Sequence, residues 1–172
     1  MLAVMAPVAQ AGPKGAVGGT FASIDGGVLR IEDWRGQVVM VVNTASRCAF
    51  TDQYRGLQAR YDRYREQGLV VLAVPSGDFN QELGSAEEVK DFCELSYGLD
   101  LPMTDITSVR GRSAHEFYKA VRSQTGFVPR WNFNKVLIGA DGTVRATWGS
   151  NMRPEAGPVI RLVETLLAEE RG

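Results

Sequence analysis

The sequence predicts an α/β fold with a parallel β-α-β unit followed by an antiparallel hairpin. Two continuous apolar runs, residues 37–43 and 69–75, have the pattern of strands buried on both faces of a sheet. Between them, Thr51 is a suitable helix N-cap, apolar residues recur on one helical face, and Gly68 is placed to end the helix. Two further extended runs flank the Asp-Gly pair at 141–142, which is a hairpin signal. A strand, helix, strand succession makes the first two strands parallel, so the complete sheet is expected to be mixed.

Four more elements complete this plan. Residues 21–36 contain two short extended pieces around an Asp-Gly pair at 25–26, which predicts an N-terminal β-hairpin. Capping boxes at Ser85 and Ser113 each open a helix, and a last helix begins at about Pro154. A β-α-β half followed by an antiparallel hairpin and a closing helix is the thioredoxin-like plan, with a central mixed sheet flanked by helices.

The composition indicates one globular domain with a small-molecule partner. The chain has 172 residues, 44% of them hydrophobic, which is enough to bury a core without disulfide or metal staples. We expect this domain to span residues 20–172, after a flexible segment at 1–19. With 19 basic and 20 acidic residues and no long block of one charge, the sequence suggests neither nucleic-acid binding nor a polybasic membrane anchor. No stretch has the apolar length of a membrane-spanning helix.

The first eleven residues leave the cellular location open. Residues 1–11 form a short apolar stretch that ends in Ala-Gln-Ala, as secretory signals do. No lysine or arginine precedes Lys14, so the basic start of such a signal is absent. We therefore consider both a cytoplasmic protein and a periplasmic one with a truncated signal peptide at 1–11.

Few residues in this chain can act as soft metal ligands. Cys48 and Cys93 are the two cysteines and His115 is the one histidine, which is too few for a structural zinc site or an iron–sulfur cluster. We therefore expect no metal and no other cofactor. Two thiols far apart in sequence can nevertheless form a redox pair.

Cys48 lies a few residues after the first predicted core strand and just before a helix. Functional residues of parallel sheets commonly lie at this carboxyl end of the strands. The helix N-terminus and the neighbouring Arg47 both favour a thiolate there. An acidic thiol alone adds little rate: moving a thiol pKa from about 8.5 to about 6 gives roughly 30-fold more thiolate, but its lower nucleophilicity costs roughly 13-fold. A fast reaction with a peroxide also needs preorganised donors for the departing oxygen, and the side chains of Gln, Asn and Trp can be such donors.

Four separated blocks provide these groups in a recognisable order. They read "NTASRCAFT", "FNQELGS", "DFCELSYGLDLPM" and "WNFNKVLI". Together they resemble the glutathione peroxidase family, in particular its cysteine-based, thioredoxin-dependent members, over nearly the whole chain from about Phe21. The four blocks in the right order make the resemblance specific, whereas any one of them alone is a weak signal.

The resemblance implies a role for five residues. The peroxidatic position falls on Cys48, and the Gln, Trp and Asn that complete the family's catalytic tetrad fall on Gln81, Trp131 and Asn132. The resolving cysteine of the thioredoxin-dependent members falls on Cys93. The implied reaction converts Cys48 to a sulfenic acid with hydrogen peroxide or an organic hydroperoxide, then to a disulfide with Cys93, which thioredoxin reduces.

The chain departs from the family pattern in two places. The second block commonly reads Asn-Gln-Phe-Gly-Gly-Gln-Glu-Pro-Gly, whereas residues 77–84 are one residue shorter and carry Leu83 in place of the proline. This departure leaves open whether Gln81 reaches the thiol. The segment between Gln124 and Trp131 lacks the long insertion of tetrameric members, so we expect a monomer.

Structural roles remain alternatives for each of these residues. Cys48 can be a packed thiol at a strand end, Cys93 a small core residue, Gln81 a solvated loop residue, Trp131 a core filler and Asn132 a turn residue. His115 is expected in the first turn of a helix.

Two other functions of this fold need residues that the sequence lacks. A disulfide reductase would need a second cysteine where Thr51 stands, and a copper carrier would need closely spaced cysteines and a histidine. A glutathione-dependent peroxidase and a peroxide sensor that passes its disulfide to a partner both remain as alternatives.

Overall fold

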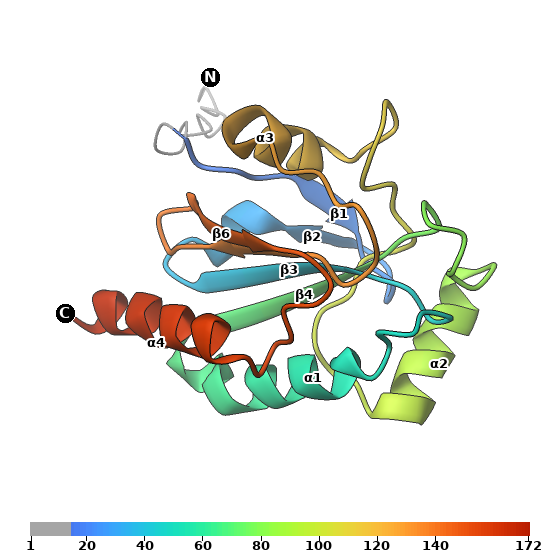
Figure 1. Cartoon of the computed structure of the whole chain (residues 1–172), viewed down its shortest axis with the longest axis horizontal. Helices are drawn as coiled ribbons and strands as arrows, with labels where there is room; N and C mark the ends of the chain where they lie inside the picture. The colour runs from blue at the N-terminus through green and yellow to red at the C-terminus, as the bar shows by residue number, and fades with distance from the viewer. Residues whose placement is uncertain (1–14) are drawn as a thin grey trace, which may run out of the picture.

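A computed structural model of the chain describes residues 15–172 and has a four-stranded mixed sheet at its centre, in the order β4-β3-β5-β6 (Figure 1). Strands β3 (Val38–Thr44) and β4 (Leu69–Pro75) pair in parallel. Strands β5 (Lys135–Ile138) and β6 (Val144–Trp148) form the antiparallel hairpin, and β5 pairs antiparallel with β3. The predicted mixed sheet and its order of elements are therefore confirmed.

Helices and a second, two-stranded sheet cover both faces of this central sheet. In Figure 1, α1 and α4 lie below the sheet, α2 lies beside the end of α1, and α3 lies above together with the hairpin of β1 and β2. The bounds are β1 Thr20–Ala22, β2 Val28–Arg30, α1 Gln53–Tyr64, α2 Ala86–Tyr97, α3 Glu116–Thr125 and α4 Gly157–Arg171, with short 3₁₀ helices at Ile31–Trp34 and Arg65–Gln67. The predicted N-terminal hairpin is therefore present.

Strand β3 is apolar from Val38 to Val42 because it separates two cores. Its side chains alternate between faces, as in any strand. Val38, Met40 and Val42 belong to the core beneath α1, α2 and α4, whereas Val39 and Val41 belong to the core beneath α3 and the β1–β2 hairpin. A strand covered on both faces has no position for a polar residue that faces solvent, which explains the continuous apolar run.

The start predicted for α2 is confirmed, whereas those predicted for α1 and for the last helix are wrong. Ser85 is the N-cap of α2, and its hydroxyl accepts a hydrogen bond from the Glu88 backbone N–H at 3.3 Å. Helix α1 begins at Gln53, one residue later than a Thr51 cap would place it, because the Thr51 hydroxyl bonds to the Cys48 carbonyl instead. The last helix begins at Gly157 rather than at about Pro154.

Helix α3 is capped by a histidine rather than by the predicted serine. The prediction that Ser113 opens this helix is wrong, because α3 begins at Glu116 and His115 occupies the N-cap position. The ring Nδ1 of His115 accepts a hydrogen bond from the Phe117 N–H at 3.1 Å, and the ring stacks on Phe21 at 3.7 Å between centroids. A ring nitrogen with a free lone pair thus replaces the hydroxyl that usually caps a helix.

Part of the segment predicted to be flexible packs against the hairpin turn of the main sheet. Val17 is fully buried, and its N–H donates to the Gly142 carbonyl at 2.8 Å. The possible signal at 1–11 lies outside the described residues. Within residues 15–172, no helix has the length and apolar character needed to cross a membrane.

Candidate peroxidase site

Cys48 lies in the irregular loop between β3 and α1 and is nearly buried, with 5% of its surface exposed. The backbone N–H of Phe50 points at its sulfur, with a nitrogen-to-sulfur distance of 3.4 Å. The Cys48 carbonyl accepts from the N–H of Thr51 at 3.1 Å, which curls the loop around the cysteine. The loop therefore holds the thiol in place and offers a backbone donor to a thiolate.

The shortened second block still reaches this loop. It follows β4, whose carboxyl end lies beside that of β3 because the two strands are parallel. Asn80 takes a left-handed conformation with φ of 59°, which a short loop can use to reverse its direction and which Asn tolerates better than most residues. The Gln81 carbonyl then accepts from the Arg47 N–H at 2.9 Å, one residue before Cys48. The two loops therefore run side by side despite the missing residue.

A half-buried carboxylate makes a second connection between the same two loops. Glu82 Oε1 accepts from the backbone N–H groups of Ser46 at 3.1 Å and of Leu83 at 2.8 Å. Burial raises the pKa of this carboxyl, and the hydrogen bonds from its neighbours oppose that shift. Sequence reasoning did not single out Glu82, although an acidic residue next to a predicted site residue is a signal that could have been followed.

Trp131 and Asn132 approach from the turn before β5. Asn132 is fully buried, and its Nδ2 donates to Gln81 Oε1 at 3.1 Å. Because this bond occupies the oxygen of the Gln81 amide, its Nε2 is left to donate to a ligand. The Trp131 ring packs 5.4 Å from the Phe79 ring and keeps 38% of its surface exposed. The structure thus brings Gln81 to both Asn132 and the Cys48 loop.

A broad groove of about 540 Å³ opens beside this cluster. It is lined on one side by Phe50 and Trp131, and further along by Phe127, Val128 and Arg130. Phe50 also contributes the N–H that points at Cys48. The groove therefore borders the residue whose backbone contacts the thiol, although Cys48 itself does not line it.

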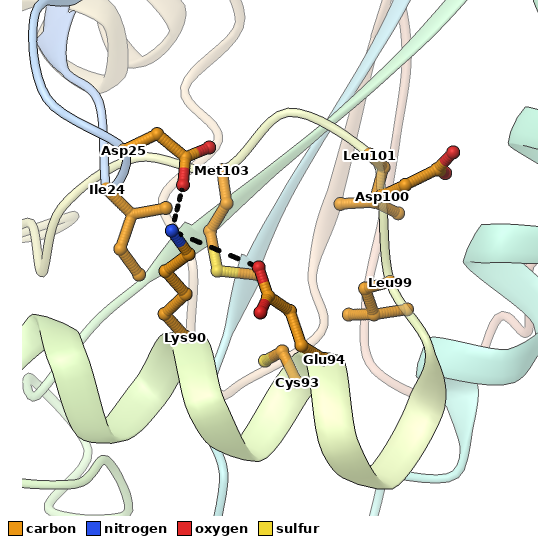
Figure 2. Close-up of a pocket in the computed structure, with 9 residues that line it drawn as sticks. All are labelled: Ile24, Asp25, Lys90, Cys93, Glu94, Leu99, Asp100, Leu101 and Met103. Carbon is orange, nitrogen blue, oxygen red and sulfur yellow. Dashed lines mark ion pairs between the residues drawn. The ribbon is translucent and has the colours of Figure 1, made fainter.

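Cys93 lies on the inner face of α2, in the same hydrophobic core cluster as Cys48. Figure 2 shows its side chain in a small cavity, about 70 Å³, which it lines together with Ile24, Leu99 and Met103 among others. Cys48 does not line this cavity, and both cysteines are free thiols. Cys93 is 1% exposed, and burial raises its pKa to about 11. The thiol is thus strongly protonated while α2 is in this position.

Ion pairs cross the mouth of this cavity. Lys90, one turn before Cys93, contacts Asp25 of the β1–β2 turn at 2.7 Å and Glu94 at 4.0 Å (Figure 2). All three side chains are substantially exposed to solvent, so these pairs contribute little stability. They tie the middle of α2 to the N-terminal hairpin, but only loosely.

The geometry agrees with the comparisons to known proteins. The family model described as glutathione peroxidase matches residues 19–122, a range that includes Cys48, Gln81 and Cys93 and stops before Trp131. The match extends over more than half of the chain. The chain belongs to the glutathione peroxidase family. Among residues 15–172 of this family member, no cluster of His, Cys, Asp and Glu side chains is arranged to hold a metal ion.

Curated relatives and solved structures support the same assignment. The chain is 39% identical to the "glutathione peroxidase-like peroxiredoxin gpx1" of Schizosaccharomyces pombe, over 76% of this chain and 86% of that protein. It is 37% identical to the "hydroperoxy fatty acid reductase gpx1" of Synechocystis sp., over 77% of this chain and 85% of that protein. The crystal structure of "Trgpx in apo form" superposes with a TM-score of 0.68 at 27% identity, covering 87% of this chain and 93% of that one. The family and the thioredoxin-like fold are therefore both shown.

Proposed function

We propose that this chain, a thiol-dependent peroxidase of the glutathione peroxidase family, uses Cys48 to attack hydrogen peroxide and organic hydroperoxides. The observation that carries the proposal is the hydrogen bond between Asn132 and Gln81, beside the loop that holds Cys48. It joins two amide side chains from distant parts of the sequence next to a nearly buried thiol. A packed structural cysteine would need no such pair of donors.

In the first step the Cys48 thiolate attacks one oxygen of the peroxide. An S–O bond forms and the O–O bond breaks, so the sulfur is oxidised to a sulfenic acid and the departing oxygen leaves as water or an alcohol after it takes up a proton. Gln81 Nε2, the Trp131 indole N–H and the Asn132 amide are assigned to the charge that develops on that oxygen. Donors fixed in advance stabilise such charge more than solvent does, because they need no reorganisation.

In the second step the Cys93 thiol attacks the sulfenic sulfur. An S–S bond forms, and the hydroxyl group leaves as water with the proton that Cys93 loses. Disulfide bonding requires Cα atoms within about 7 Å of each other. Because Cys93 faces a cavity that Cys48 does not reach, we propose that α2 opens or unwinds locally before this step.

An external dithiol then reduces the Cys48–Cys93 disulfide. We propose thioredoxin rather than glutathione as this reductant, because an internal disulfide is a natural substrate for a protein dithiol. The name peroxiredoxin given to the Schizosaccharomyces relative supports this choice. We also propose that the protein acts as a monomer, which size-exclusion chromatography with light scattering tests.

The groove beside Trp131 favours organic hydroperoxides as well as hydrogen peroxide. Its aromatic and aliphatic lining, from Phe50, Phe127 and Val128, suits an apolar substituent. The Synechocystis relative is named for hydroperoxy fatty acids, which supports the same substrate class. We therefore propose that alkyl hydroperoxides are accepted.

A NADPH-coupled assay tests these assignments. Wild type, Cys48→Ser and Cys93→Ser are each measured with hydrogen peroxide and either thioredoxin with its reductase or glutathione with its reductase. We expect no activity in the Cys48 variant, and loss of thioredoxin-supported activity in the Cys93 variant. An unaffected rate in Cys93→Ser would remove Cys93 from the mechanism.

A peroxide sensor is the remaining alternative, since the same donors would serve a protein that passes its disulfide to a partner. Steady turnover with a general thioredoxin system supports the enzyme. Oxidation that stalls after one equivalent of peroxide until a particular partner protein is added would support the sensor.

A further inference from the structure

Three successive backbone carbonyls in the turn before β5 are each held by a buried side chain. In residues 131–133, the first carbonyl accepts from Asn43 Nδ2 at 2.8 Å and the second from the Ser150 hydroxyl at 2.5 Å. The third accepts from Lys135 Nζ at 2.6 Å. A turn fixed carbonyl by carbonyl has little freedom, and the Asn132 side chain is the part of it that touches Gln81.

Lys135 holds the most unusual residue of this turn. Phe133 has φ of 59°, in the left-handed region that bulky side chains rarely adopt. Its carbonyl is the one that Lys135 binds, and its N–H donates to the Asn43 carbonyl at 2.6 Å. Because the backbone direction at Phe133 fixes where the preceding residue points, the Lys135 bond helps to aim Asn132.

The same amino group connects the turn to the Cys48 loop. Lys135 Nζ also donates to Gln53 Oε1 at 2.7 Å, at the first residue of α1. The Gln53 N–H bonds the Phe50 carbonyl at 2.9 Å, and Gln53 Nε2 donates to the Ser150 carbonyl at 2.7 Å. Lys135, Gln53 and Ser150, which we call the Lys135 network, thus join the segments that carry Cys48 and Asn132.

A lysine at this position is costly for stability. Its side chain is fully buried, and the two groups that accept its hydrogen bonds are both neutral. Burial lowers the pKa of Lys135 to about 7; of the charged groups facing it, Glu155 favours its ammonium form and Arg153 opposes it. A methionine would fill the same space without this penalty. The cost is understandable if the lysine contributes to the reaction through the residues it holds.

We propose that Lys135 is a positioning residue of the peroxidase site: it binds the Phe133 carbonyl and Gln53 and thereby aligns Asn132 and Gln81 with Cys48. This inference rests on the proposed function. It concerns the alignment of the donors that stabilise the charge on the departing oxygen, and not the reactivity of the thiol itself.

This role predicts a selective defect. Attack on a peroxide needs the aligned donors, because negative charge develops on an oxygen that must leave. Alkylation of the same thiol by iodoacetamide expels iodide, which needs no such donors. A change that only disturbs the Cys48 loop or the stability of the fold affects both reactions, whereas misaligned donors affect the peroxide reaction alone.

The test measures both reactions of Cys48 in proteins that also carry Cys93→Ser, so that one thiol reacts. The variants are Lys135→Met and, as a matched control, Leu137→Ala, which removes a fully buried core side chain two residues along the same strand. We expect Lys135→Met to lower the rate constant with hydrogen peroxide at least tenfold while that with iodoacetamide changes less than twofold. The control should leave the ratio of the two rate constants unchanged at temperatures where it is folded.

Two results would overturn the inference: an unchanged peroxide rate constant in Lys135→Met, or an equal fall in both rate constants. A failure of the proposed function is distinct, because the Cys93→Ser parent would then react with hydrogen peroxide no faster than free cysteine. Should Lys135→Met not fold, Gln53→Met tests the same network, since it removes one of the two acceptors that hold Lys135 Nζ. There we expect about a threefold selective loss in the peroxide reaction, and an unchanged ratio of the two rate constants would also overturn the inference.

Discussion

Replacing Ser85 with alanine tests whether Cys93 reaches Cys48 through an opening of helix α2. The Ser85 hydroxyl accepts a hydrogen bond from the Glu88 N–H at 3.3 Å, and Glu88 Oε2 lies 3.2 Å from the same hydroxyl. The first contact caps the N-terminus of α2, and the second joins the two side chains across its first turn. They exist only while the helix is formed, so their loss destabilises the closed position of Cys93 and leaves the opened one unchanged.

The size of the effect follows from the cap. Loss of a serine N-cap costs about 1 kcal/mol of helix stability. At about 1.4 kcal/mol for each factor of ten, the opened form of α2 becomes about five times more populated. If opening precedes the attack of Cys93 on the sulfenic acid, disulfide formation should become about fivefold faster in Ser85→Ala, although the variant is less stable.

The assay follows one turnover without reductant. The reduced protein is mixed with one equivalent of hydrogen peroxide, quenched at intervals with a sulfenic-acid trap, and analysed by mass for trapped and disulfide-bonded forms. Ser85→Asp keeps a good N-cap and should match the wild type. Disulfide formation that is unchanged or slower in Ser85→Ala would refute the reasoning, because it would mean that Cys93 attacks from an intact helix.

Two further predictions concern the same site. Gln81→Ala should slow the oxidation of Cys48 by hydrogen peroxide at least tenfold in stopped-flow measurements, and a change below twofold would argue against its role as a donor. The rate of disulfide formation should rise with pH, because only deprotonated Cys93 attacks. Because the closed helix, which holds the Cys93 pKa at about 11, is the dominant form, the rate should keep rising with pH beyond the ordinary thiol range. A profile that levels off near the ordinary thiol pKa would contradict this reasoning, because it would mean that the exposed thiol is the dominant form.

The central sheet could be predicted from the sequence because burial on both faces leaves a simple pattern. The first five residues of β3 and the whole of β4 are continuous apolar runs that no amphipathic helix would show. The helix caps were harder to predict, because several neighbouring side chains could accept a hydrogen bond from the same backbone N–H groups at the start of a helix. Thr51 bonds the Cys48 carbonyl and leaves α1 uncapped, and His115 caps α3 with a ring nitrogen where Ser113 had the expected pattern.

The partners within the site depend on contacts that sequence distance hides. The resemblance named Gln81 and Asn132, but their mutual hydrogen bond joins residues 51 positions apart and depends on left-handed backbone at Asn80 and Phe133. The hydrophobic periodicity of the sequence does not indicate which residues other than glycine adopt a left-handed backbone conformation. Lys135 did leave a signal, since a lysine at the start of a buried apolar strand must find polar partners inside the protein.

The most direct test of the account treats reduced wild-type protein with one equivalent of hydrogen peroxide and identifies the oxidised residues by peptide mass spectrometry. We expect a Cys48–Cys93 disulfide in the wild type and a trapped sulfenic acid on Cys48 in Cys93→Ser. Cys48 that remains a free thiol after the peroxide is consumed would contradict the claim that it is the nucleophile.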